Sequence, residues 1–120
     1  MWKTLIAAAS IVAVALPFAA SAHHSAAEYD LSIRDHYVTG IVKEFKPANP
    51  HTKIVLEVTD EKGARDIEFE GHSQNNFYRS GWRVGLVKVG DEITVQAAPP
   101  RDGSDGGYVL GVIAADGTKF

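Results

Sequence analysis

The stretch KIVLEVTDEKGARDIEFE, residues 53–70, decides the fold of this chain. Apolar and polar residues alternate on both sides of a central turn sequence, Asp60-Glu61-Lys62-Gly63. The apolar positions are Ile54, Leu56, Val58, Ile67 and Phe69. An alternation with a period of two is typical of a strand that buries one face, and Asp and Gly favour tight turns. Residues 53–59 and 64–70 are therefore predicted to form an antiparallel hairpin.

The same alternation predicts how the two strands pair. With the turn at 60–63, Thr59 pairs with Ala64, and Ile54 then faces Phe69 across the core side. A slip by one residue would set Ile54 against an acidic side chain, which burial of one face forbids.

Four further elements are expected around the hairpin. Strands are predicted over residues 38–45, around Ile93 and Val95, and over residues 108–114, with Gly40 and Gly111 at sharp bends or bulges. Ser73 is predicted to cap a short helix through Arg79 that Gly81 ends. Five short strands with one helix between the third and fourth are the order of an all-β, OB-like barrel. A five-stranded meander with a stray helix is the alternative.

Composition bounds the function. The chain has 120 residues, of which 45% are apolar and 22% charged, and this is the size of one domain. Acidic residues outnumber basic ones 15 to 12, and there is no cysteine, which excludes disulfides and thiol chemistry. The outer positions of the hairpin carry four carboxylates, one cation and no aromatic ring, so nucleic acid is not an expected partner. These positions are Lys53, Val55, Glu57, Asp66, Glu68 and Glu70.

The first residues have the features of a signal peptide. Lys3 precedes an apolar run over residues 5–20, and Ala20-Ser21-Ala22 is a small-residue cleavage sequence. We therefore expect residues 1–22 to be a cleaved signal peptide, residues 23–36 an N-terminal arm and residues 37–120 the barrel. This predicts a periplasmic protein without membrane insertion after cleavage. A membrane anchor is the alternative, for which the apolar run is short.

An ordered set of motifs resembles a family of small exported bacterial proteins of unknown function. The motifs are Ala22-His23-His24-Ser25, Ala27-Glu28-Tyr29-Asp30, Asn49-Pro50-His51, Arg79-Ser80-Gly81-Trp82 and Arg101-Asp102-Gly103-Ser104. Members of that family carry AHHS at the mature N-terminal region and an NPH loop. The resemblance implies a periplasmic OB-like fold and brings no established activity. Thr52-Lys53 departs from the expected pattern by placing a cation beside the NPH loop.

The sequence contains no motif of a hydrolase or transferase. It lacks a G-x-S-x-G elbow, an H-E-x-x-H helix and a phosphate-binding G-K-[ST] loop. Asp102 to Gly107 lacks the acidic spacing of a calcium loop and is predicted to be a plain hairpin loop. We therefore expect a protein that is not an enzyme.

Histidines supply the remaining signal. In the predicted register His51 lies opposite His72 on the outer face, where opposed Cβ atoms are ~5 Å apart and two imidazoles can share one metal ion. Glu70, diagonal to His51, is a third ligand or a group that orients a ring. The alternative is a pair of surface histidines without a ligand.

Processing would create a second group of donors. Cleavage after Ala22 leaves His23 at the amino terminus, where its α-amine (pKa ~7.7–8.0) and imidazole (~6.5) can chelate a metal beside His24. Nitrogen-rich sites of this kind suit copper(II), with nickel and zinc behind. The alternative is that this polar His-His pair is merely compatible with signal-peptide cleavage and binds no metal. His36 has no predicted partner and is assigned a structural role.

The sequence thus predicts a carrier or buffer of a transition metal, with possible ligands His51, His72, His23, His24 and Glu70. A module that binds a protein partner or a small periplasmic ligand is the main alternative, and an accessory protein whose histidines serve folding is a third. Phe77 and Trp82 are predicted to close the bottom of the barrel. Tyr29 and Tyr37 are candidates to line a groove with the arm, although the sequence does not tell where the arm runs.

Overall fold

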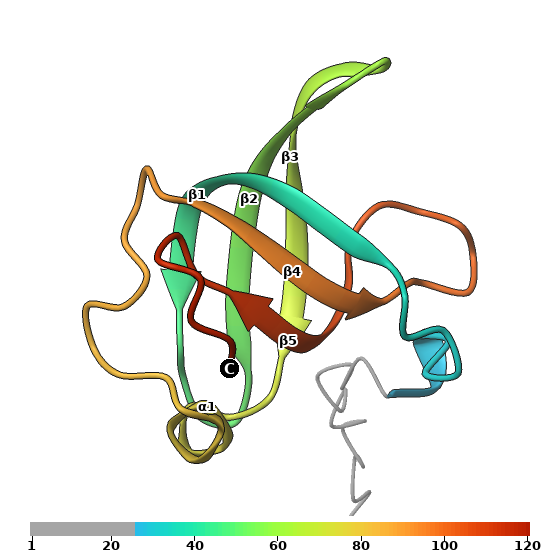
Figure 1. Ribbon diagram of the computed structural model, residues 1–120. Coiled ribbons are helices and arrows are strands. Elements are labelled where there is room, and N and C mark those ends of the chain that lie inside the picture. Colours follow the sequence, from blue (N-terminus) through green and yellow to red (C-terminus); the bar gives the residue numbers. More distant parts are fainter. Residues whose placement is uncertain (1–25) are drawn as a thin grey trace, which may run out of the picture.

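The computed structural model describes residues 26–120. Along the chain come a 3-10 helix η1 (Ala26–Glu28), strands β1 (Tyr37–Lys46), β2 (Thr52–Asp60) and β3 (Gly63–Gly71), helix α1 (Gln74–Ser80), and strands β4 (Glu92–Ala98) and β5 (Gly107–Ile113) (Figure 1). The predicted signal peptide, His23 and His24 lie outside the described residues. Within residues 26–120, no helix has the length and apolarity needed to span a membrane.

The five strands form one closed barrel in the order β1-β2-β3-β5-β4, and β1 pairs with β4 to complete it. Only the β3–β5 pair is parallel among these strands. Helix α1 lies between β3 and β4 in the chain and sits below one end of the barrel (Figure 1). The predicted all-β, OB-like barrel is therefore confirmed.

The β2–β3 hairpin has the predicted register. Thr59 pairs with Ala64 and Ile54 with Phe69, and the ladder runs from Asp60↔Gly63 to Thr52↔Gly71. Both strands are slightly longer than predicted, because regular pairing continues to the turn and to the residues just after the NPH loop. The predicted inward and outward faces are therefore correct.

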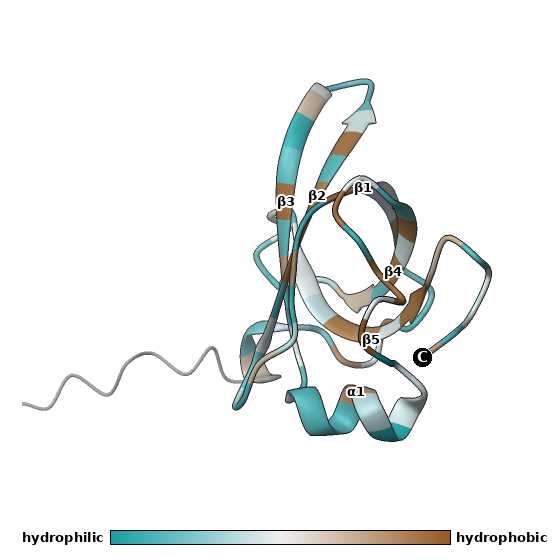
Figure 2. Ribbon diagram, turned by 90° about the vertical axis from the view of Figure 1, so that its left-hand side faces the viewer, coloured by the Kyte–Doolittle hydropathy of each residue, from teal (hydrophilic) through white to brown (hydrophobic). Residues whose placement is uncertain are grey.

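The core consists of the inward-facing apolar residues of the strands together with residues that close one end. Figure 2 shows the apolar colour recurring along the strands, while α1 is mostly hydrophilic. In α1 only Phe77 is buried, and it is 4% exposed, as is Trp82 just after the helix. Phe45 and Phe120 pack against this pair with ring centroids 5.6–6.4 Å apart. The predicted closure of the barrel by Phe77 and Trp82 is confirmed.

Ser73 and Gly81 define the ends of α1, and Gly40 allows two strands to approach closely. Ser73 caps the helix by accepting from the Asn76 N–H, and Gly81 ends it in the left-handed region at φ 114°. Gly40 was predicted at a bend or bulge, but the register shift in β1 lies between Val42 and Glu44. Gly40 instead allows β2 to approach, because a Cβ there would lie 2.6 Å from the Glu57 carbonyl oxygen.

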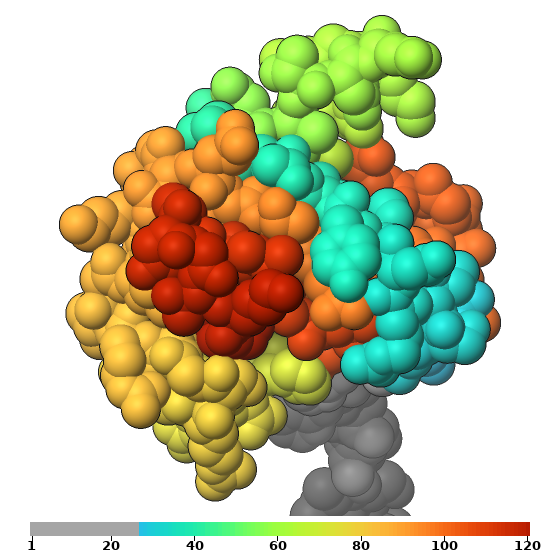
Figure 3. Space-filling model, viewed as in Figure 1, coloured from blue at the N-terminus to red at the C-terminus, as the bar shows by residue number. Residues whose placement is uncertain are grey.

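From residue 26 onward, the N-terminal arm folds back onto the barrel. Tyr29 forms an isolated bridge with Pro100, and the Asp30 N–H donates to the Pro99 carbonyl at 2.9 Å. Arg101 donates its backbone N–H to the Glu28 carbonyl and its Nε to the Ala27 carbonyl, at 2.9 and 3.0 Å. In Figure 3 the blue and cyan residues accordingly lie beside the orange residues of the β4–β5 loop. The arm is therefore docked along this loop.

Candidate functional site

Five polar or aromatic side chains come together on the outer side of β2, β3 and β5. They form a set that we call the outer-face cluster: Tyr29, His51, Glu70, His72 and Tyr108. The residues just before β2 and just after β3 supply the two histidines, because the hairpin pairing ends at Thr52↔Gly71. The parallel pairing of Glu70 with Tyr108 brings β5 beside them.

Glu70 joins the arm to His51. Its Oε2 accepts a hydrogen bond from the Tyr29 hydroxyl at 3.3 Å, while its Oε1 lies 3.9 Å from Nδ1 of His51. The Glu70 side chain is 22% exposed, compared with 41% for His51, so the carboxylate is the more enclosed partner. The predicted diagonal contact between His51 and Glu70 therefore exists.

His72 has a different partner. Its Nδ1 lies 3.0 Å from the Tyr108 hydroxyl, and the two rings meet edge to face at 89° with centroids 5.0 Å apart. The backbones around the two histidines stay paired, since the Thr52 N–H donates to the His72 carbonyl at 3.1 Å. The Tyr29 ring lies 5.8 Å from that of Tyr108, so the arm contacts this half of the cluster as well.

A complete metal site is not assembled from the described part of the chain. Within residues 26–120, no three side chains among His, Cys, Asp and Glu gather in a group that could hold a metal ion. Of the predicted ligands, the structure brings His51 to Glu70 and brings His72 to a tyrosine instead. His23 and His24 precede the described residues.

Both tyrosines of the cluster keep their protons at neutral pH. Burial, reinforced by the Glu70 carboxylate, raises the pKa of Tyr29 to about 12. Burial and Glu70 also raise the pKa of Tyr108. The Tyr29 hydroxyl is consequently the donor to Glu70. When His72 carries its proton on Nδ1, it donates to the Tyr108 oxygen and keeps Nε2 as a lone-pair donor.

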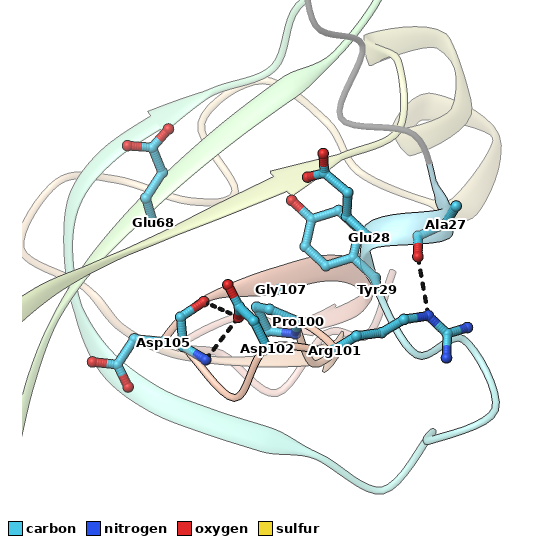
Figure 4. Close-up of a pocket in the computed structure, with 10 residues that line it drawn as sticks. Ala27, Glu28, Tyr29, Glu68, Pro100, Arg101, Asp102, Asp105 and Gly107 are labelled. Carbon is cyan, nitrogen blue, oxygen red and sulfur yellow. Dashed lines mark hydrogen bonds between the residues drawn. The ribbon is translucent and has the colours of Figure 1, made fainter.

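Two grooves meet at Tyr29 and Glu68, which line both of them. The smaller, about 340 Å³, lies beside His51 and Glu70. The larger, about 600 Å³, lies between the arm and the β4–β5 loop (Figure 4). Tyr29 thus lines a groove with the arm, whereas Tyr37 lines other depressions of the surface.

Charged groups at these grooves are held by local contacts. Arg101 reaches back to the Ala27 carbonyl in Figure 4. Ser104 donates its N–H and hydroxyl to Asp102 at 2.9 and 2.6 Å. Lys53, the cation beside the NPH loop, lies 3.6 Å from Glu44 and 3.7 Å from Glu68. Lys53 is therefore the cation nearest in the ladder to the cluster, since it pairs across the strands with Glu70 and lines the smaller groove beside His51.

The sequence pattern does not single out Tyr108. Its place depends on the parallel pairing of β3 with β5, which no turn sequence specifies. The one feature of Tyr108 that the sequence shows is an outward position at the start of a predicted strand. His36 lies outside the cluster and contributes its carbonyl oxygen to the Ala97 N–H at 3.0 Å.

Comparison with known proteins places the chain in a family. No curated protein and no solved structure matches it significantly. The sequence model of a family described as "Family of unknown function (DUF6152)" matches residues 10–109, which is most of the chain and extends into β5. The protein therefore belongs to this family of unknown function.

Proposed function

We propose that this protein binds a transition metal ion on its outer-face cluster, with copper(II) ahead of nickel and zinc. The observation that carries the proposal is the environment of the two imidazoles. Nδ1 of His51 faces the Glu70 carboxylate, and Nδ1 of His72 is bonded to the Tyr108 hydroxyl. Metal-binding histidines characteristically present one nitrogen to the ion while the other contacts an oxygen of the protein. His51 and His72 would thus bind the metal through Nε2, and Glu70 would orient a ring.

The N-terminal residues are the proposed source of the remaining ligands. His23 precedes Tyr29 by six residues, a span of at most ~20 Å in an extended chain. Because Tyr29 is docked at the cluster, the α-amine and imidazole of His23 and the imidazole of His24 are within reach of it. A nitrogen-rich set of this kind favours copper(II) among the common divalent ions.

The proposal requires cleavage after Ala22, because the α-amine of His23 can bind a metal only when it is free. It also includes a periplasmic location for the cleaved protein. The role is carriage or buffering, with no catalytic step assigned.

The binding of a small periplasmic ligand or a protein partner is the second candidate function. It is favoured by the two grooves of about 340 and 600 Å³ that meet at Tyr29. They lie by the outer faces of β2 and β3 and by the β4–β5 loop, which are the surfaces where OB folds usually bind ligands.

A calorimetric titration with copper(II) tests the proposal. The sample is tag-free protein that begins at His23, compared with a His51→Ala/His72→Ala variant and with a version extended by one residue at the N-terminus. His36→Ala is the matched control, because His36 lies outside the cluster. We expect one ion per chain, at least ~10-fold weaker binding in the double variant, and a smaller loss on extension.

Other outcomes assign the site differently. Loss of binding only on N-terminal extension would move the site to His23 and leave the barrel as a scaffold. Failure of copper, nickel and zinc to bind would refute the metal proposal and favour the groove ligand.

A further inference from the structure

Tyr29 is the residue through which the docked arm touches the partners of both histidines. Its hydroxyl donates to Glu70, which faces His51, and its ring lies 5.8 Å from that of Tyr108, which is bonded to His72. The contact links residues far apart in the chain, since Tyr29 and Glu70 are 41 positions apart. One side chain of the arm thus contacts a partner of each histidine, Glu70 for His51 and Tyr108 for His72.

The arm is held at this place by backbone bonds on either side of Tyr29. Before it, the Glu28 carbonyl accepts from the Arg101 N–H, and after it the Asp30 N–H donates to the Pro99 carbonyl. The bridge between Tyr29 and Pro100 lies between these two bonds. The backbone contacts that dock the arm therefore also place Tyr29 at the cluster.

We propose that Tyr29 is a positioning residue that couples docking of the N-terminal arm to metal binding at His51 and His72. The inference rests on the proposed metal function. With the arm docked, Tyr29 fixes the Glu70 carboxylate by one oxygen, so that the other faces His51. Its ring also limits the movement of Tyr108, which holds His72. With the arm undocked, both orienting groups lose this support.

Coupling of this kind is reciprocal. If docking raises the affinity for the metal by a given factor, then the metal stabilises the docked arm by the same factor. Removal of a group that orients a metal-binding histidine typically lowers affinity ~10–100-fold. Because Tyr29 acts through Glu70 and Tyr108, we expect the lower end of this range, about tenfold.

The test combines copper affinity with amide hydrogen exchange in protein that begins at His23. Tyr29→Phe keeps the ring and removes only the bond to Glu70. Tyr37→Phe is the matched control, because Tyr37 is 55% exposed and lines other depressions of the surface. The exchange is followed at the amides of Asp30 and Arg101, which report docking of the arm.

We expect Tyr29→Phe to bind copper(II) about tenfold more weakly and Tyr37→Phe to bind it as the parent does. Copper should slow exchange at Asp30 and Arg101 about tenfold in the parent and less in Tyr29→Phe. In the His51→Ala/His72→Ala background, Tyr29→Phe should cause no further loss of affinity. A purely structural role for Tyr29 would not produce this dependence on the histidines.

The outcomes separate the two proposals. Equal copper affinity in the parent and Tyr29→Phe, together with amide exchange at Asp30 and Arg101 that copper does not slow, would overturn the coupling. The proposed metal function would then still stand. A loss of affinity in Tyr29→Phe that persists in the double-histidine background would also overturn it. Failure of the parent to bind copper would overturn the proposed function and the coupling together.

Discussion

The hydroxyl of Tyr108 lies 3.0 Å from Nδ1 of His72, and the edge of one ring meets the face of the other. Strand β5 thereby holds an imidazole that follows strand β3. Two interactions contribute to this hold, a hydrogen bond and a ring contact, and only the hydrogen bond depends on the hydroxyl.

Tyr108→Phe separates these two interactions. We expect copper(II) affinity to fall ~10-fold, because the imidazole keeps its ring contact and loses the bond that orients it. Stability should fall by only about 0.5–1.5 kcal/mol, the usual net contribution of one hydrogen bond. Calorimetry and urea unfolding measure the two quantities. Tyr78→Phe, on exposed α1 surface, is the control, and unchanged copper affinity in Tyr108→Phe would contradict the assignment of Nε2 as the metal donor.

Gly40→Ala is expected to destabilise the barrel by about 1–3 kcal/mol, the typical cost of overpacking. The added methyl group would lie 2.6 Å from the Glu57 carbonyl oxygen and 3.1 Å from Cβ of Leu56, and neither can move without shifting β2. Urea unfolding measures the change. Gly111→Ala is the matched control, because the nearest contact of its added methyl group is the Gln96 side-chain oxygen at 3.2 Å, and the nearest backbone atom is the Phe120 carbonyl oxygen at 3.5 Å. Similar losses in both variants would argue against the close approach of β1 and β2.

Acid should weaken the link between the β2–β3 turn and the β4–β5 loop. Arg65 donates to Asp60 and to Asp105, each at 2.7 Å, and these hydrogen bonds lower the pKa of both carboxyl groups. A lowered pKa in the folded state gives stability above the ordinary value, ~3.9, that is lost as the pH falls below it. We therefore expect the parent to lose more stability than Arg65→Met between pH ~5 and ~2.

Urea midpoints of the two proteins at several pH values test this, with Arg79→Met on α1 as the control. If the free energy of unfolding falls equally in the parent and in Arg65→Met over this pH range, Arg65 does not lower the pKa values of the two aspartates.

Alkali should act on Tyr29 in the opposite sense. Its pKa is raised to about 12 from the ordinary value of 10.0, first by burial and then by Glu70. The stability that the neutral hydroxyl contributes is complete below pH 10 and is lost as the pH rises to 12. The stability difference between the parent and Tyr29→Phe should therefore narrow over this range. Urea unfolding at pH ~8 and ~11.5 measures it, and a constant difference would contradict the raised pKa.

The hairpin could be predicted because one-face burial leaves it a single register. Ile54 and Phe69 occupy the core only when Thr59 pairs with Ala64, and this pairing also places His51 near Glu70. The helix could be predicted because its ends need specific groups. Ser73 supplies an acceptor for a backbone N–H, and Gly81 adopts a left-handed conformation.

The rest of the cluster could not be predicted from such patterns. The arm is docked largely by backbone groups, as in the bridge between Tyr29 and Pro100, and backbone bonds leave little trace in the sequence. Tyr108 reaches the cluster through a parallel pairing, for which neither a turn nor an alternation gives the register. The contacts of Tyr29 and Tyr108 therefore required the structure, whereas the two histidines and the approach of Glu70 to His51 did not.

The β3–β5 ladder has a consequence for the order in which the protein folds. Among the described ladders it is the shortest, with the pairs Phe69↔Gly107 and Glu70↔Tyr108. The bond between His72 and Tyr108 crosses it and joins residues 36 positions apart, whereas the β2–β3 hairpin closes over a tight turn. Local pairings form before distant ones, because closing a long loop costs more entropy. We therefore expect the cluster to assemble late in folding, so that a ligand held across it would select fully folded chains and slow their unfolding.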